Sequence, residues 1–308
     1  MTLQQLHYIL ALDEYRHFVR AAESCRVAQP TLTLQVKKLE TEVGFNIFDR
    51  SSKPLKPTAT GERFLARSRQ IIREVDALKN FVNEEKHQLS GTFKIGIIPT
   101  LAPYLLPLFL KNFIDEHPMV NLEIKEMQSN LVMEKLRNAT IDIGLMATPT
   151  EDRKLREVPL FNEPFHVYAH PNHRLLRNEY LVADNLREEG LWILDQGHCF
   201  RNQVLNICQN ESEHALERTS FDSGSIETLK NMIKSYNGYT LVPELAIDEM
   251  DIDYIKSFAQ PQPSREISLV VNKGFSKELL LQELKKAILK TIPGHFSRNN
   301  KMVTIKWR

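Results

Sequence analysis

The pattern of the sequence changes at Ser90-Gly91, and this change divides the chain into two kinds of structure. Before it, apolar residues recur at helical spacing, and the stretch from Glu62 to Glu85 contains neither glycine nor proline. After it, short apolar runs typical of strands alternate with helical segments. Such alternation is typical of an α/β domain with a mostly parallel sheet. The sequence therefore predicts a helical N-terminal part, a long helix and a larger α/β domain.

The first 60 residues are expected to form an α winged helix-turn-helix. Residues 4–12 and 19–27 are predicted as two short helices, and a third opens at Gln29-Pro30-Thr31, where a proline near the first helical position loses no hydrogen bond. The apolar stripe of this third helix is Leu32, Val36, Leu39 and Val43. Residues 47–60, with two prolines, are predicted to form a short two-stranded wing. Two helices with a tight turn and a basic loop favour binding to double-stranded DNA.

The candidate DNA contacts lie at the start of the third helix and in the wing. Short polar side chains and amides can reach base edges in a major groove, whereas cations bind phosphates and set the register. The candidates are Gln29, Pro30, Thr31, Thr33, Gln35, Lys37, Arg50 and Lys53. The wing segment 50–60 contains no acidic residue, which supports this interpretation. An ordinary solvated surface is the alternative for any one of these clusters.

Residues 61–89 are expected to form a linker helix that pairs with a second copy of the chain. Its apolar positions fit a repeat of alternating four- and three-residue steps: Phe64, Ile71, Val75, Leu78 and Val82. A helix of about 25 residues is about 37 Å long, and an apolar seam along it needs a partner. A long helix packed only on its own domain is the alternative.

Residues 90–308 are expected to form the larger α/β domain, with a cleft between two subdomains. The predicted strands are 92–99, 120–127, 142–147, 165–169, 191–194, 239–242 and 267–271. The predicted helices are 103–116, 129–138, 225–236 and 276–290. Subdomain I takes residues about 90–162 and 267–292, and subdomain II takes residues about 163–266. The basic tail HFSRNNKMVTIKWR after Pro293 is expected to be a frayed, solvated terminus.

Composition narrows the class of protein. Hydrophobic residues make up 42% and charged residues 26%, so a packed core is expected, and the net charge is only +1. No apolar run approaches the roughly 20 residues of a membrane span, and the N-terminus lacks the pattern of a signal peptide. Three cysteines, Cys25, Cys199 and Cys208, are too few for a disulfide-stapled secreted scaffold. A cytoplasmic protein with no membrane partner is expected.

Two N-terminal segments, FVRAAESCRVAQPTLTLQVKKLETEVGFNIFDR and PTATGERFL, resemble the DNA-binding domain of LysR-type transcriptional regulators. Three later segments, IGIIPTLAPYLLP, DQGHCFRNQVLNIC and SIETLKNMI, resemble the members of that family that sense hydrogen peroxide. The resemblance covers the whole chain. It implies a regulatory domain like type 2 periplasmic binding proteins, and an activator that works as a homodimer or homotetramer and controls oxidative-stress genes. It also implies a reversible Cys199–Cys208 disulfide.

The residues around Cys199 support this interpretation. His198 and Arg201 flank the cysteine in the sequence, and a helix opening near Arg201 would place its positive end beside the sulfur. Both influences are expected to favour the thiolate, the form that attacks peroxide, with Cys208 as the resolving thiol. Cys25 is expected to be an inert small apolar residue.

Peroxide chemistry also needs groups that stabilise the leaving oxygen. Thr100 and Ser129 follow predicted strands, at the sheet edge where α/β domains hold ligands. In the family, hydroxyl residues at these positions bind peroxide together with the histidine and arginine of the GHCFR motif, here His198 and Arg201. Ser129 stands where threonine is expected, and Asn202 stands where aspartate is common. Capping of the following helices is the alternative role for both hydroxyls.

The spacing of the two cysteines predicts a change of shape. Nine helical steps span about 13 Å, whereas the Cα atoms of a disulfide lie within about 7 Å, so the segment between them must refold. Cytoplasmic disulfide reductants would reverse the change, and RNA polymerase is an expected partner. No enzyme activity, metal or cofactor is expected. The alternatives are a regulator that binds a small organic effector in the cleft, and a thiol-dependent peroxidase.

Overall fold

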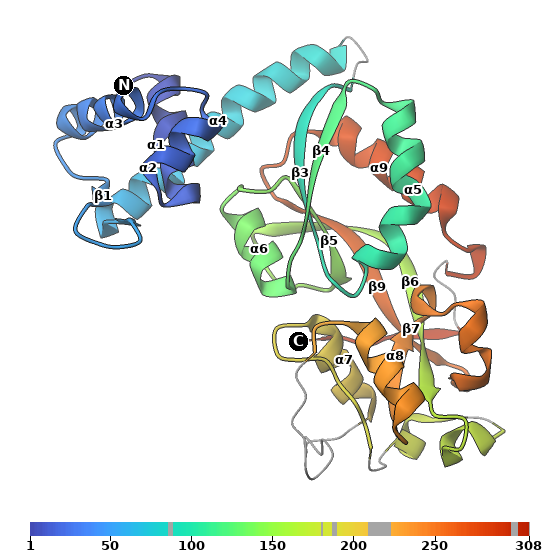
Figure 1. Cartoon of the computed structure of the whole chain (residues 1–308). Coiled ribbons are helices and arrows are strands. Elements are labelled where there is room, and N and C mark those ends of the chain that lie inside the picture. The colour runs from blue at the N-terminus through green and yellow to red at the C-terminus, as the bar shows by residue number, and fades with distance from the viewer. Residues whose placement is uncertain (86–88, 180, 187–189, 209–222, 297–300, 308) are drawn as a thin grey trace. The chain divides into compact units, whose positions relative to one another are not determined.

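The structure is a computed structural model that describes residues 1–85, 89–179, 181–186, 190–208, 223–296 and 301–307. The chain forms two compact units: residues 1–88 with 138–140, and residues 89–137 with 141–308. Figure 1 shows the smaller unit as helices with a small hairpin and the larger as a sheet covered by helices. Within the described residues, no helix is both long enough and apolar enough to cross a membrane.

The smaller unit confirms the predicted winged helix-turn-helix. Its helices are α1 (Leu3–Tyr15), α2 (Phe18–Ser24) and α3 (Gln29–Val43), and its wing strands β1 (Phe48–Asp49) and β2 (Lys56–Pro57) pair antiparallel. Helix α2 ends three residues before the predicted end, because Arg26 takes a left-handed φ of 55° and Val27 N–H donates to the Ala22 carbonyl. The apolar face of α3 packs on α1 and α2, which leaves its polar face outward.

Helix α4 (Ala59–Glu85) follows the wing and has two faces. Leu65, Ser68 and Ile72 are buried against the smaller unit. Of the predicted seam, Ile71 is 41% exposed and Leu78, seven residues further on, is 67% exposed. Val82, also in that seam, lies outside the residues whose side chains are described. An apolar stripe of α4 thus remains uncovered by the described part of this unit.

The larger unit is built on a mixed sheet. The strand order is β4 (Val120–Glu126), β3 (Gly91–Ile97), β5 (Ile143–Thr148), β9 (Gln262–Asn272), β6 (Leu155–Ala169) and β7 (Tyr239–Pro243). β8 (Ile255–Ser257) pairs with β6, and β10 (Met302–Thr304) pairs with β9. The helices are α5 (Ala102–Glu116), α6 (Ser129–Arg137), α7 (Cys199–Cys208), α8 (Ile226–Ser235) and α9 (Glu278–Thr291). Five short 3₁₀ turns complete the described elements: 174–177, 183–186, 244–246, 249–254 and 294–296.

The expectation of a mostly parallel sheet was wrong. Among the described strands, β3–β4, β3–β5 and β9–β10 pair parallel, whereas β9 and β6 run antiparallel to their main neighbours. The strand predicted at 191–194 was also wrong, since Leu191 makes a single bridge to Tyr239. β6 begins at Leu155, well before the predicted 165, because its first half pairs with β9 and its second half with β7 and β8.

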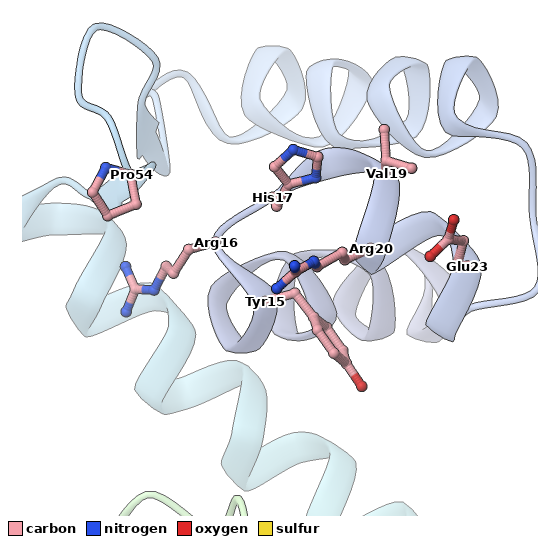
Figure 2. A pocket seen from close by; sticks show the side chains of 7 residues that line it. All are labelled: Tyr15, Arg16, His17, Val19, Arg20, Glu23 and Pro54. Carbon is pink, nitrogen blue, oxygen red and sulfur yellow. The ribbon is translucent and has the colours of Figure 1, made fainter.

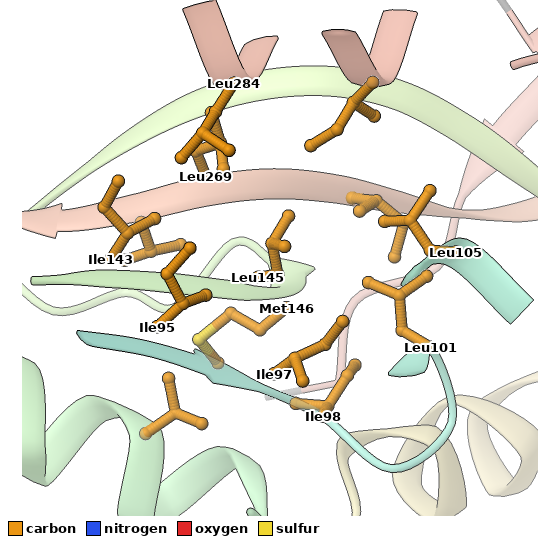
Figure 3. Packing of buried hydrophobic residues seen from close by; sticks show 14 of the residues in the cluster. Ile95, Ile97, Ile98, Leu101, Leu105, Ile143, Leu145, Met146, Leu269 and Leu284 are labelled. Atoms are coloured by element: carbon orange, nitrogen blue, oxygen red, sulfur yellow. The ribbon is translucent and has the colours of Figure 1, made fainter. Parts of the chain in front are cut away.

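The larger unit has two separate hydrophobic cores, and the long strand β6 contributes side chains to both. The first core lies under α5, α6 and α9 and includes Ile95, Leu145 and Leu269, as Figure 3 shows. The second core lies between the second half of β6, β7, α7 and α8, and includes Phe165, Phe200 and Leu241. Two separate cores that share β6 agree with the predicted pair of subdomains.

The expectation of a frayed C-terminal tail was wrong for the described residues 301–307. Met302–Thr304 pair with Gln262–Ser264 of β9, and Ile305 N–H donates to the Ser264 carbonyl at 2.8 Å. The Trp307 side chain is buried, with 4% exposure, in the first core. Ile305 and Trp307 lie two positions apart and pack on the cores, which holds this segment against the larger unit.

Candidate functional site

Cys199 is the first residue of α7, and its sulfur is enclosed. The residue is 2% exposed and belongs to the first core. The backbone N–H groups of Ala147, at the end of β5, and Phe200, next in α7, lie close to the sulfur and favour its anion, and the Ser129 hydroxyl at the start of α6 lies beside it. Three elements thus converge on one thiol, which is free, as are the thiols of Cys25 and Cys208.

The sequence predicts that the neighbours of Cys199 favour its thiolate, but in the structure the pKa of this thiol is raised. Burial raises the pKa of the Cys199 thiol, and the Ser129 hydroxyl, the charge of Arg265 and the two backbone donors oppose that rise. The prediction considered only neighbours in sequence and the helix N-terminus, and it omitted the cost of placing a thiolate in the core. The resting thiol is therefore protonated at neutral pH and surrounded by groups that favour its anion.

Arg265 is the cation of this site, and sequence reasoning missed it. It is fully buried on β9, where its Nε donates to Glu163 Oε2 at 2.8 Å and its Nη2 forms an ion pair with the same oxygen at 2.8 Å. Its Nη1 donates to Thr100 Oγ1 and its Nη2 to the Thr100 carbonyl, both at 2.9 Å. The guanidinium lies 5.8 Å from the Phe200 ring centroid, at the start of α7. The signal available in the sequence was the charged pair Arg265-Glu266 at the start of the strand segment SREISLVV, whose second half is mostly apolar.

Thr100 and Ser129 both lie at the end of strand–helix connections in this site, and neither caps a helix. Both residues are 2% exposed. Thr100 Oγ1 accepts from Arg265, which leaves its hydroxyl proton to donate. The Ser129 hydroxyl has no oxygen or nitrogen partner in the described part of the chain, and it faces the Cys199 sulfur. A buried hydroxyl in that state can bind a small polar molecule at the sulfur.

His198 and Arg201 are engaged elsewhere than at the sulfur. His198 Nε2 lies 3.0 Å from Asp195 Oδ1, and burial lowers the pKa of the ring, so the imidazole is neutral at pH 7. Arg201 Nη1 donates to the Leu194 carbonyl at 2.8 Å. These contacts fix the loop that leads into α7. The structure therefore assigns the charge beside Cys199 to Arg265 instead of the two sequence neighbours.

Cys208 closes α7 at its other end and lies in the second core. It is fully buried, and burial raises the pKa of its thiol to about 12. α7 covers the predicted helical stretch through Cys208, while Gln209 lies outside the described residues. Nine helical steps separate the two Cα atoms by about 13.5 Å. The two thiols thus lie at opposite ends of one helix and in different cores.

The predicted base-reading residues differ in their exposure and in the hydrogen bonds that they make within the protein. Gln29, Pro30 and Thr31 are exposed at the start of α3. Thr33 is half-buried, and its hydroxyl accepts from Gln29 Nε2 at 3.0 Å, so this pair holds one orientation. Gln35 is half-buried and accepts from Gln5 of α1 at 3.3 Å, which ties it to the domain interior.

The predicted phosphate-binding cations also differ in whether their charge is already paired within the protein. Lys37 and Lys53 are exposed. Arg50 donates to the buried Glu40 at 2.9 Å and lies 5.9 Å from the Phe18 ring centroid, so its charge is partly compensated. Glu40 also accepts from the backbone N–H groups of Ile47 and Phe48, which fixes the start of the wing on α3.

A pocket of about 560 Å³ lies between the α1–α2 corner and the wing loop. Figure 2 shows it lined by Arg16, His17 and Arg20, together with Tyr15, Val19, Glu23 and Pro54. Arg16 pairs with Asp13 at 2.8 Å. Three basic side chains that the sequence analysis did not single out therefore lie beside the wing.

Known proteins share both units of this chain. Residues 3–62 match the model of the bacterial regulatory helix-turn-helix proteins of the LysR family, and residues 86–292 match the LysR substrate binding domain. A hydrogen peroxide-inducible genes activator from Haemophilus influenzae is 36% identical over 89% of this chain and 91% of its own length.

Solved structures agree. A full-length OxyR variant from Pseudomonas aeruginosa is similar with a TM-score of 0.80 and 31% identity, covering 95% of this chain and 99% of that one. A mutant OxyR from Corynebacterium glutamicum with hydrogen peroxide bound has a TM-score of 0.62 and 28% identity, covering 94% and 92%.

Proposed function

Because the chain belongs to the LysR family of DNA-binding transcriptional regulators, and within it to the OxyR group, we propose that its signal is hydrogen peroxide, sensed by Cys199. The observation that carries the proposal is the enclosed sulfur beside the Ser129 hydroxyl, which has no oxygen or nitrogen partner among the described residues, and near Arg265, which binds Thr100. The C. glutamicum OxyR mutant was solved with hydrogen peroxide bound, which supports the same ligand here.

In the first step, peroxide enters between Ser129 and Thr100 and oxidises the thiol. The Cys199 thiol loses its proton, its sulfur attacks one peroxide oxygen, an S–O bond forms and the O–O bond breaks. The departing hydroxide takes up the proton and leaves as water, so one thiol and one peroxide give one sulfenic acid and one water. Thr100 can donate its hydroxyl proton to the departing oxygen, because Arg265 already donates to its oxygen. His198 and Arg201 then act by fixing the loop before α7.

In the second step, Cys208 resolves the sulfenic acid. The Cys208 sulfur attacks the Cys199 sulfur, the S–O bond breaks, and the oxygen leaves with the Cys208 proton as water. The disulfide cannot form across an intact α7, because about 13.5 Å exceeds the roughly 7 Å limit for its Cα atoms. At least one cysteine leaves its core, so α7 unwinds. We propose that this refolding re-spaces the DNA-binding units, and that disulfide reductants reverse it.

The smaller unit provides the DNA contacts in this proposal. Gln29, Pro30, Thr31 and Thr33 face base edges, and Lys37 and Lys53 bind phosphates, with Arg50 and Gln35 mainly shaping the surface. The uncovered stripe of Ile71 and Leu78 on α4 supports pairing with a second copy as a dimer, and two dimers would form a tetramer. RNA polymerase is the proposed partner in activation.

Mass spectrometry after peroxide treatment tests the proposal. Reduced protein receives one equivalent of hydrogen peroxide, free thiols are blocked, and the unreduced digest is searched for a peptide pair joined through Cys199 and Cys208. We expect that pair in the wild type and in Cys25→Ser, and its absence in Cys199→Ser. Thiols that stay free, combined with a small organic molecule that raises the melting temperature, would identify an effector-binding regulator instead.

A further inference from the structure

The last described residues of the chain are attached to α7, the helix between the two cysteines. Three amide side chains of α7 donate to three consecutive backbone carbonyls of the C-terminal segment. Asn202 Nδ2 donates to the Trp307 carbonyl at 3.1 Å, Gln203 Nε2 to the Ile305 carbonyl at 2.8 Å, and Asn206 Nδ2 to the Lys306 carbonyl at 2.8 Å. Figure 1 shows the C-terminus beside α7.

The other edge of this segment is fixed to the sheet. Gln262 N–H donates to the Lys301 carbonyl and Ile305 N–H donates to the Ser264 carbonyl, both at 2.8 Å. Ile305 packs on the second core and Trp307 on the first. Residues 301–307 therefore bridge β9, which carries Arg265, and the helix that carries both thiols.

Gln203, the buried one of the three amides, binds the C-terminal segment at a cost in desolvation energy. Gln203 is 0% exposed, and its Oε1 has no hydrogen-bond partner in the described part of the chain. An apolar side chain would occupy this position without burying an unpaired oxygen. What the amide gains is the bond from Nε2 to the Ile305 carbonyl.

We propose that residues 301–307 are a strap that holds α7 in its helical, dithiol form, and that the Cys199–Cys208 disulfide releases it. Asn202, Gln203 and Asn206 are then positioning residues for the redox reaction. All three lie between the cysteines, and Asn202 and Asn206 share one face because they are one helical turn apart. When α7 unwinds, the three donors lose the spacing that matches the three carbonyls. This inference rests on the proposed function, which supplies peroxide as the oxidant.

The strap stabilises only the dithiol form, so it raises the reduction potential of the disulfide. Losing one such hydrogen bond favours the disulfide about fivefold, the equivalent of about 1 kcal/mol. A fivefold change lowers the reduction potential by about 20 mV. Removal of the whole segment has a larger effect, because Ile305 and Trp307 leave the cores as well.

Redox titration of the full chain against glutathione buffers tests the strap. Asn202→Asp and Asn206→Asp keep the shape of the side chain but replace the donor with an acceptor that faces a carbonyl. We expect each to favour the disulfide at least fivefold, and a chain ending at Lys301 to favour it more. Thr304→Ala is the matched control, since it changes an exposed strap side chain and leaves the three carbonyls in place. Its titration should match the wild type.

A double-mutant cycle separates the strap from a direct effect on the helix. In the chain ending at Lys301, Asn206→Asp should have no further effect on the potential, because its partner carbonyl is gone. Trp307 supplies a second measurement: its fluorescence, assigned with Trp307→Phe, should become accessible to iodide on oxidation and be shielded again on reduction.

The outcomes distinguish the two proposals. A wild type that never forms the Cys199–Cys208 disulfide overturns the proposed function, and it also overturns the strap proposal, which depends on that disulfide. A wild type that forms the disulfide while Trp307 stays shielded, with unchanged potentials in both Asn→Asp variants, overturns the strap alone. An effect of Asn206→Asp that persists in the truncated chain assigns it to helix stability and also overturns the strap.

Discussion

Replacing Ser129 by alanine should make the protein more stable and less reactive at the same time. The Ser129 hydroxyl is buried without an oxygen or nitrogen partner in the described residues, so folding removes its water and returns only a weak contact with sulfur. An unsatisfied buried polar group costs about 1–3 kcal/mol. Since the sulfur contact and the lost packing offset part of this, we expect Ser129→Ala to raise the free energy of unfolding by about 1 kcal/mol.

The same substitution should slow the oxidation of Cys199. The hydroxyl favours the anionic sulfur and lies where peroxide would bind, and hydrogen bonds to charged groups contribute about 1.5–3 kcal/mol. Losing one in the transition state lowers the rate of sulfenic acid formation about 10- to 150-fold. Stopped-flow mixing with peroxide in a Cys208→Ser background, with trapping of the sulfenic acid, measures this rate. Urea titration measures the stability.

Ser268→Ala is the matched control for both measurements. Ser268 is also buried, but its hydroxyl lies 2.7 Å from the Thr148 hydroxyl and hydrogen-bonds to it. Its loss should destabilise the protein by about 1 kcal/mol and leave the rate of oxidation unchanged. If Ser129→Ala were destabilised like Ser268→Ala and kept its rate, the unpartnered hydroxyl would have no role in peroxide binding.

Four further predictions concern Arg265, the Cys199 thiol, the exposed stripe of α4 and the wing. Arg265→Met should slow oxidation and cost about 3–5 kcal/mol of stability because Glu163 stays buried and unpaired, and adding Glu163→Gln should recover the stability in urea titrations but not the rate. Because burial raises the pKa of the Cys199 thiol above its ordinary value, the thiolate fraction and with it the rate of sulfenic acid formation should keep rising between pH 7 and 8, and a plateau below pH 8 would contradict this. Leu78→Glu should dissociate dimers in analytical ultracentrifugation, since it places a charge on the exposed stripe of α4. Lys53→Ala should weaken binding to all DNA sequences alike and reduce the slope of affinity against salt by about 1.

The fold was largely predictable because its signals are local. The stripe of Leu32, Val36 and Leu39 specifies the buried face of α3, and the alternation of apolar runs with helices specifies the α/β unit. Strand direction was not predictable in this way. β6 pairs antiparallel with β9 and contributes side chains to both cores, and this arrangement is set by tertiary packing.

The candidate site shows where reasoning from neighbours in sequence stops. Cys199, Thr100 and Ser129 were predicted, and the structure brings Ser129 to the sulfur and Thr100 to Arg265. The cation itself comes from a residue more than sixty positions away in sequence, and the loop residues His198 and Arg201 bind Asp195 and Leu194 instead.

The placement of the two thiols in different cores explains how a small oxidant can change a large protein. Burial keeps both thiols protonated, and a protonated thiol reacts slowly with oxidants in general. At Cys199 that cost is offset only where Ser129, Arg265 and two backbone donors meet, so a molecule must fit there to react. Once a sulfenic acid has formed, the disulfide can be reached only by removing a cysteine from its core and unwinding α7. The chemistry is therefore local, while the packing that it disrupts belongs to both subdomains, and this is the coupling that a redox-controlled regulator requires.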